Sequence, residues 1–395
     1  MWSVGVHGSS SAFREQQRLL FAIGGETRTE EDRAMQRQLL MEMTTDGNCR
    51  GMVIEDLNNR ESLLAVRGAV HQTCMGNALL FRAHFIVVAS TPSNCKLEEV
   101  TARVEQALLT LQFQQLDLLL LHAHSLPGTN GLFARKQAVL EAWEHMMAIQ
   151  QAGLVQHIGI SDLSVQDVDF LLTAYPNSIP QAWLMEIQLP GMTASSDSDV
   201  PLEDVIAFAH SHGIDVLGRF PFYCLDNLQL YEEWKLLAEN LSEKYRERPF
   251  KFLVAHENEG TASSYHMESH ALGNTKVMQT SLQIAVRYLL QKGLVVIPQV
   301  FNDLQPDNQH EQAALREIFG PLAHPFTGIH PSCSPHKVHS SLLTRDDLTA
   351  IDRALPLTTG FPQPTPISTT GASRPGSTQK RRMNLPAVNR LPTAD

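Results

Sequence analysis

The chain has 395 residues, of which 43% are hydrophobic and 18% charged, as is ordinary for a globular protein with a large core. Its net charge of -11 argues against nucleic acid as the main partner, because phosphate binding needs a positive surface. No apolar run approaches the ~20 residues of a membrane span, so we expect no membrane partner. Widely spaced cysteines show no disulfide framework and indicate a reducing compartment, the cytoplasm or the mitochondrial matrix. They are Cys49, Cys74, Cys95, Cys224 and Cys333.

Residues 1–20 are interpreted as an N-terminal extension. They hold Arg14 and Arg18 against a single acid, Glu15, with a serine cluster at residues 9–11. This composition is typical of a mitochondrial leader, and it also fits a short disordered extension. Both alternatives stay open at this point.

From residue 21 onward, short apolar runs alternate with stretches of helical period. The runs expected as strands are 85–88, 116–121, 157–160, 183–187, 215–217 and 294–297. The expected helices are 97–111, 137–152, 165–174 with Ser164 as the N-cap, 202–212, 228–245 and 280–291. Strands that are apolar on both faces belong to a parallel sheet covered by helices. The repeated βα units favour a closed α/β barrel over an open doubly wound sheet.

The segment Leu116–His122 is an apolar run that ends in a histidine. It resembles the fourth strand of the aldo-keto reductase family, which ends in the catalytic histidine. Residues 152–162, 212–216, 287–298 and 343–352 resemble, in the same order, its fifth strand, its seventh strand, its last helix and strand, and its C-terminal helix. The resemblance implies a (β/α)8 barrel of the aldo-keto reductase (TIM barrel) type over residues 21–356. It also places any site at the C-terminal ends of the strands.

The resemblance implies a catalytic tetrad of which only two members match. The family uses a tyrosine as proton donor, a lysine that lowers its pKa, an aspartate that pairs with the lysine, and a histidine that orients the carbonyl. Asp56 matches the aspartate and His122 the histidine. Residues 57–62 contain no tyrosine, and Ser90 stands at the lysine position. We interpret Asp56 and His122 as relics, for which a turn role and a structural role are the plain alternatives.

The positions that would hold NADPH are also altered. Ser161 matches the family's serine after strand five, but Asp162 replaces the asparagine and has no N–H to offer a carboxamide. Arg219 could contact phosphate, while Gln299 follows the last strand where the family carries phosphate-binding residues. We therefore expect no cofactor, or NADPH if the chain is an active reductase.

Residues 302–340 are interpreted as an insertion on the top face of the barrel. Four side chains of zinc-ligand type lie there, at His330, Cys333, His336 and His339, but their spacing matches no known finger. His122 and His124 share a strand face without an evident third ligand. We predict no metal site.

Residues 357–395 are predicted to be a disordered tail. They are rich in Pro, Ser and Thr, and Asp395 is their one acid. The basic residues are Arg374, Lys380, Arg381, Arg382 and Arg390. The tail could carry an address signal, bind an acidic partner or simply be solvated, and it is the one segment for which contact with nucleic acid stays open.

Two functions follow from these observations. The first is a non-catalytic barrel that serves as a structural or regulatory subunit and binds a protein partner. Residues 160–163, 176–178 and 207–214 resemble the modifier subunit of glutamate–cysteine ligase, a family branch that also lacks a working tetrad. The second is a divergent NADPH-dependent reductase of a carbonyl substrate, with Tyr223 or Tyr265 as an unrecognised proton donor.

Overall fold

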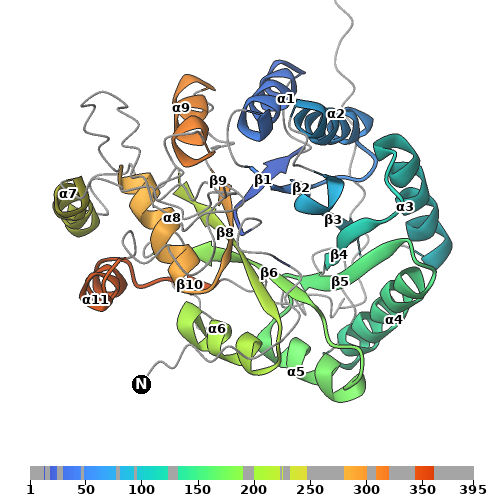
Figure 1. The fold of residues 1–395 in the computed structure, drawn as a ribbon. Coiled ribbons are helices and arrows are strands. Elements are labelled where there is room, and N and C mark those ends of the chain that lie inside the picture. Colours follow the sequence, from blue (N-terminus) through green and yellow to red (C-terminus); the bar gives the residue numbers. More distant parts are fainter. Residues whose placement is uncertain are drawn as a thin grey trace, which may run out of the picture. The chain divides into compact units, whose positions relative to one another are not determined.

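A ring of parallel strands inside a layer of helices makes up the fold (Figure 1). The chain divides into two units, Met1–Gln363 and Pro364–Asp395, and all the structure described below lies in the first. The computed structural model describes residues 13, 18–24, 30–45, 49–76, 81–92, 96–122, 132–189, 200–222, 225, 232–246, 280–299, 308–319 and 343–359.

Eight strands follow one another around the ring, each paired in parallel with the next. A parallel bridge between Leu19 and Val296, with Val296 N donating to Arg18 O at 2.8 Å, joins the last strand to the first. The predicted (β/α)8 barrel is therefore confirmed. The strands are β1 (Leu20–Ile23), β2 (Gly51–Ile54), β3 (Ile86–Pro92), β4 (Leu116–His122), β5 (Val155–Ser161), β6 (Ala182–Gln188), β8 (Asp215–Pro221) and β9 (Val295–Gln299).

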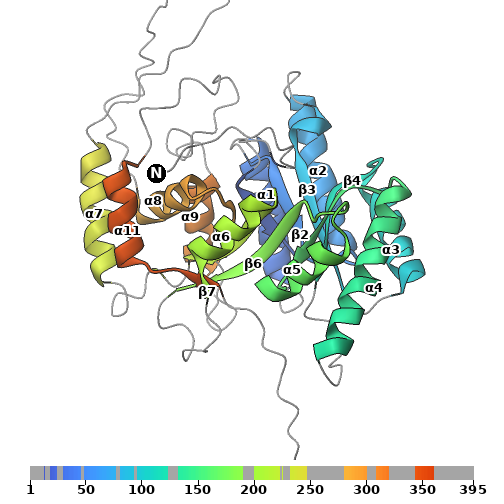
Figure 2. The same cartoon turned by 90° about the horizontal axis from the view of Figure 1, so that it is seen from below.

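One helix follows each barrel strand. These helices are α1 (Glu30–Thr45), α2 (Arg60–Gly76), α3 (Leu97–Leu111), α4 (Leu132–Gln151), α5 (Val165–Ala174), α6 (Leu202–Ser211), α8 (Ser281–Gln291) and α9 (Asn308–Phe319). A short 3-10 helix, η2 (Arg82–His84), precedes β3. Two helices lie outside this set, α7 (Glu232–Arg246) and α11 (Arg345–Ala354), and they pack side by side in both views (Figures 1 and 2).

Local sequence sets the ends of several helices as predicted. Helix α3 occupies the expected residues 97–111 and buries one face, made by Val100, Val104, Ala107, Leu108 and Leu111. Helix α5 starts after Ser164, whose hydroxyl accepts from Asp167 N at 3.2 Å. Helix α4 begins five residues before the expected start at 137.

The interior of the barrel is filled by side chains of alternate strand residues. The interior cluster comprises Leu20, Val53, Ile86, Val88, Leu118, Leu120, Ala182, Leu184, Leu217, Val295 and Ile297, together with Phe13 from before the first strand. Gly159 is needed among them, because a Cβ there would lie 2.6 Å from Ala182 O and 2.7 Å from Leu120 Cδ2.

Three boundaries predicted from the sequence are wrong in part. Phe13 and residues 18–20, assigned to an N-terminal extension, belong to the barrel. Helix α9 lies in the insertion expected at 302–340, but it packs against α1 and α8 and is the eighth barrel helix. Leu357 is buried, and β10 (Thr358–Thr359) pairs antiparallel with β6 and with β7 (Val200–Pro201), so the disordered tail cannot start at 357.

The other predictions for these segments concern residues outside those described: residues 1–12, 320–340 and 360–395. Of the helices in the described part of the chain, none is both long and apolar enough to cross a membrane.

Candidate functional site

The C-terminal ends of the barrel strands carry a set of polar side chains. Interior-facing residues recur every second position, so the series Val53, Val88, Leu120, Leu184, Leu217 and Ile297 leads two residues on to the following set. Its members are Glu55, Ser90, His122, Glu186, Arg219 and Gln299. Ser161 joins them, because it pairs in register with His122. We call these residues, with Asp162, the barrel mouth.

An ion pair connects two strand ends of the barrel mouth. Arg219 Nη2 from β8 lies 3.8 Å from Glu55 Oε1, which directly follows β2. The two side chains are 17% and 30% exposed. The Arg219 Nε atom is buried and has no hydrogen-bond partner among the described residues. The cation is therefore only loosely neutralised.

A histidine–carboxylate pair lies at the ends of β4 and β5. His122 Nδ1 is 3.4 Å from Asp162 Oδ2, and the same oxygen accepts a hydrogen bond of 2.6 Å from Ser161 Oγ. Asp162 has a left-handed backbone (φ 58°), which aspartate tolerates better than most residues, and its N–H donates to Leu184 O at 3.0 Å. The turn after β5 thus directs the carboxylate back toward His122.

Ser90 stands where the family resemblance calls for lysine. It lies on the interior-facing series of β3 and is 7% exposed. Its Oγ is buried and makes no hydrogen bond within the described structure. No positive charge is therefore supplied from this strand end.

Asp56 does not extend the interior-facing series of β2. Its carboxylate accepts a hydrogen bond from Asn58 N at 2.8 Å, and its carbonyl accepts from Asn59 N at 3.1 Å, just before α2 starts at Arg60. Asp56 is thus a turn residue, the plain alternative stated above. The mouth-facing acid at the end of β2 is Glu55, which the sequence reasoning missed although the alternation from Val53 pointed to it.

The barrel mouth can orient an imidazole and present a cation, but the described residues add no phenol or ammonium to it. A carboxylate at Nδ1 fixes the orientation of His122, as it does for catalytic and metal-bound histidines. Among the described residues no group of three or more His, Cys, Asp or Glu could hold a metal. His124, Tyr223, Tyr265 and the zinc-type residues 330–339 lie outside the described residues.

The sequence model of the aldo/keto reductase family matches residues 82–311, more than half of the chain. This chain belongs to the aldo/keto reductase family. The match spans the segments from η2 to the start of α9 and includes Ser90, His122, Ser161, Asp162 and Arg219. No curated protein sequence matches the chain.

Solved structures of aldo/keto reductases share the fold. An aldo/keto reductase from Brucella melitensis is 15% identical with a TM-score of 0.51, and the match covers 85% of this chain and 94% of that one. Gox0644 in its apo form is 15% identical with a TM-score of 0.50, over 85% and 89%. The aldose reductase of Schistosoma japonicum is 14% identical with a TM-score of 0.50, over 84% and 87%. These likenesses establish the fold.

Proposed function

We propose that this family member does not reduce carbonyls and acts as a structural or regulatory subunit of a larger protein assembly. The observation that carries the proposal is the pairing of Arg219 with Glu55. Arg219 is the one lysine or arginine on the described interior-facing strand ends, and its partner is a carboxylate rather than a phenol. The described residues of the mouth therefore lack the phenol with an adjacent cation that serves as proton donor in the family's reaction.

The residues that would hold the nicotinamide support the same proposal. A carboxamide oxygen needs a donor, whereas the Asp162 carboxylate only accepts. It already accepts from Ser161 Oγ and faces His122 Nδ1. The Ser161–Asp162 pair therefore does not fit the carboxamide oxygen of the nicotinamide, and we derive no step through NADPH.

The partner would be a protein in the cytoplasm or the mitochondrial matrix. The modifier subunit of glutamate–cysteine ligase, which residues 160–163 and 176–178 resemble, is the precedent for such a role. The basic tail is the segment through which an acidic partner would bind.

Two observations favour the alternative, a divergent NADPH-dependent reductase. The buried Arg219 Nε has no partner among the described residues, and a phosphate oxygen could supply one. His122 is also oriented by Asp162, as a carbonyl-binding imidazole would be. This alternative requires a proton donor from outside the described residues, such as Tyr223 or Tyr265.

NADPH titration of the purified full-length chain separates the two functions. We expect no saturable binding by calorimetry up to millimolar cofactor, and no oxidation of NADPH with a panel of aldehydes and ketones. Micromolar binding that is weakened in Arg219→Met, with carbonyl-dependent oxidation that is lost in His122→Ala, would establish the reductase. Lys235→Met on α7, an exposed cation away from the mouth, serves as the matched control.

The subunit role also has a positive test. The tagged chain, isolated from its own cells, is expected to run with a protein partner in fixed stoichiometry by native mass spectrometry. Adding the purified chain back to that partner should change the partner's activity or thermal stability. A chain that is monomeric in its own cells and has no effect on any co-purified protein would contradict the proposal.

A further inference from the structure

Helix α8 carries a buried arginine that the barrel mouth does not use. Arg287 is 4% exposed, and it lies one helical turn from Gln283 on one side and from Gln291 on the other. All three side chains therefore point from the same face of α8.

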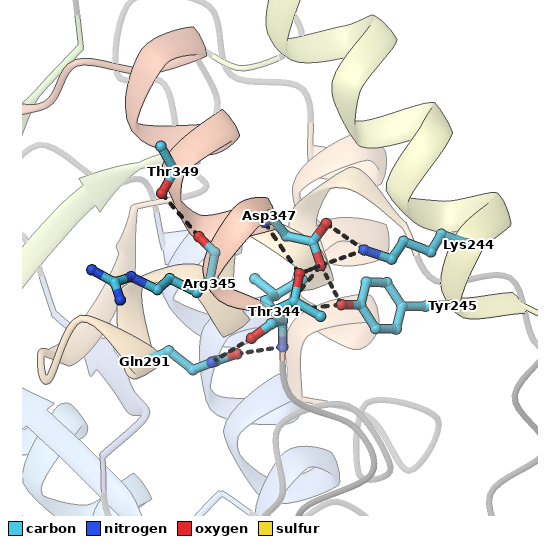
Figure 3. Close-up of polar contacts among 8 residues, drawn as sticks. Lys244, Tyr245, Gln291, Thr344, Arg345, Asp347 and Thr349 are labelled. Carbon is cyan, nitrogen blue, oxygen red and sulfur yellow. Dashed lines mark hydrogen bonds and ion pairs between the residues drawn. The ribbon is translucent and has the colours of Figure 1, made fainter. Parts of the chain in front are cut away.

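Both glutamines of this face are fully engaged. Gln283 donates to Glu317 O near the end of α9 at 3.1 Å. Gln291 donates to Leu343 O at 3.2 Å and accepts from Leu343 N at 2.8 Å, directly before α11 (Figure 3). Arg287 thus leaves α8 between the end of α9 and the start of α11.

Two nitrogens of Arg287 have no such partner among the described residues. Its Nε and Nη2 atoms are buried and make no hydrogen bond within the described structure. Burial lowers the pKa of this guanidinium to about 10, and the nearby Tyr245 is the group that opposes the shift. The side chain therefore stays charged at neutral pH.

The nearby carboxylate is committed elsewhere. Asp347 accepts from Lys244 Nζ at 2.6 and 2.8 Å, from Tyr245 Oη at 2.5 Å and from Thr344 Oγ1 at 2.6 Å (Figure 3). The Tyr245 hydroxyl in turn accepts from Thr344 N at 3.2 Å. A buried cation without a counter-charge is strongly destabilising, and the described residues supply none that is hydrogen-bonded to Nε or Nη2 of Arg287, so this position calls for an anion.

The two unpartnered nitrogens indicate the shape of that anion. Nε and Nη2 lie on the same edge of the guanidinium, and their N–H bonds run parallel, which matches two oxygens of one carboxylate or phosphate. We propose that this edge of Arg287 binds a small soluble oxyanion at the junction of α8 with α9 and α11. The site is independent of the barrel mouth, so it stands or falls separately from the proposed subunit function.

Thermal unfolding of the full chain in inorganic phosphate tests the site. Phosphate is varied up to 10 mM against chloride at constant ionic strength, which keeps general salt effects small. We expect a saturable rise in Tm of about 2 to 4 °C, as for a ligand that binds the folded state alone. Calorimetric titration with phosphate should show one site.

Variants test whether the phosphate-dependent rise in Tm depends on the Nε–Nη2 edge of Arg287. Arg287→Met removes the charge, and Arg287→Lys keeps the charge but lacks the two parallel donors; both should lose the phosphate-dependent rise. Arg316→Met, which removes an exposed guanidinium on α9, should keep it. If Arg287→Met does not fold, Arg287→Lys decides the question.

Two outcomes overturn the proposal. The first is a wild-type Tm that does not respond to phosphate, which would mean that Arg287 is unpaired or takes a carboxylate of this chain. The second is a rise of the same size in Arg287→Lys, which would place the phosphate elsewhere.

Discussion

Two polar clusters of this protein differ in how closely their charged groups contact one another. At the α7–α11 junction, Asp347 holds Lys244, Tyr245 and Thr344 through contacts of 2.5 to 2.9 Å (Figure 3). At the barrel mouth, the Glu55–Arg219 and His122–Asp162 pairs are 3.8 and 3.4 Å apart. The charged groups of the junction are therefore closely paired, whereas the two ion pairs of the mouth are long.

The difference in contact distances distinguishes a cluster that stabilises the fold from a cluster retained from the family's site. Short, multiple hydrogen bonds to one buried carboxylate stabilise the fold by fixing α11 against α7. Long ion pairs at a solvent-accessible strand end contribute little. The two long ion pairs of the mouth therefore add little to folding, although Ser161 still donates to Asp162 there at 2.6 Å. The residues of these ion pairs are what remains of a family site, or they belong to a site that binds a separate ligand.

The largest expected effect comes from the junction. Asp347→Asn keeps the shape of the side chain but leaves Lys244 and Tyr245 facing an amide, and we expect a loss of about 3 kcal/mol in the free energy of unfolding. Urea denaturation measures it. Asp346→Asn, an exposed neutralisation in the same first turn of α11, is the matched control and should change the free energy by less than about 0.5 kcal/mol. Equal losses in the two variants would show that the contacts of Asp347 add no more stability than an exposed carboxylate does.

The same carboxylate predicts how stability falls in acid. Burial raises the pKa of Asp347, but hydrogen bonds from Lys244, Thr344 and Tyr245 outweigh burial and bring it to about 2, below its ordinary 3.8. A depressed folded-state pKa gives stability that is present above the unfolded value and is lost as the pH falls through 3.8 toward 2. The expected loss is about 2 kcal/mol, at about 1.4 kcal/mol per pKa unit.

Unfolding free energies of the wild type and Asp347→Asn between pH 6 and 2 isolate this contribution. The two curves should converge as the pH approaches 2, since the wild-type side chain becomes increasingly protonated as the pH nears its folded-state pKa. Parallel curves over the whole range would contradict the assignment.

The fold could be predicted because the composition of the barrel strands identifies them. Runs such as Leu116–Leu121 are apolar on both faces, and helix α3 shows its buried face in the spacing of Val100, Val104 and Ala107. The eighth barrel helix was taken for part of an insertion. The phosphate-binding pattern that precedes this helix in the family is absent here, so no motif marks the helix in the sequence.

The site was harder to predict, because its residues meet only through register. Motif matching assigns the family's aspartate to Asp56. The strand alternation instead directs Glu55, one residue earlier, into the barrel mouth. The Ser161–Asp162–His122 contact depends on the left-handed turn at Asp162, which no local pattern announces. Arg287 matches a helix motif of the family in the sequence, and only the packed structure shows that its Nε and Nη2 have no partner among the described residues.

The smallest expected effect compares two serines of the mouth. Ser90→Ala removes a buried hydroxyl that has no partner in the described structure, so it should leave the unfolding free energy unchanged or raise it by up to about 1 kcal/mol. Ser161→Ala removes a hydroxyl that donates to Asp162 at 2.6 Å and should cost about 1 to 2 kcal/mol, because a buried carboxylate loses a donor. Urea denaturation of both variants under one set of conditions gives the difference. If Ser90→Ala is the more destabilising of the two, the Ser90 hydroxyl has a partner after all, and this strand end is then an occupied part of the mouth rather than the vacant lysine position of a reductase.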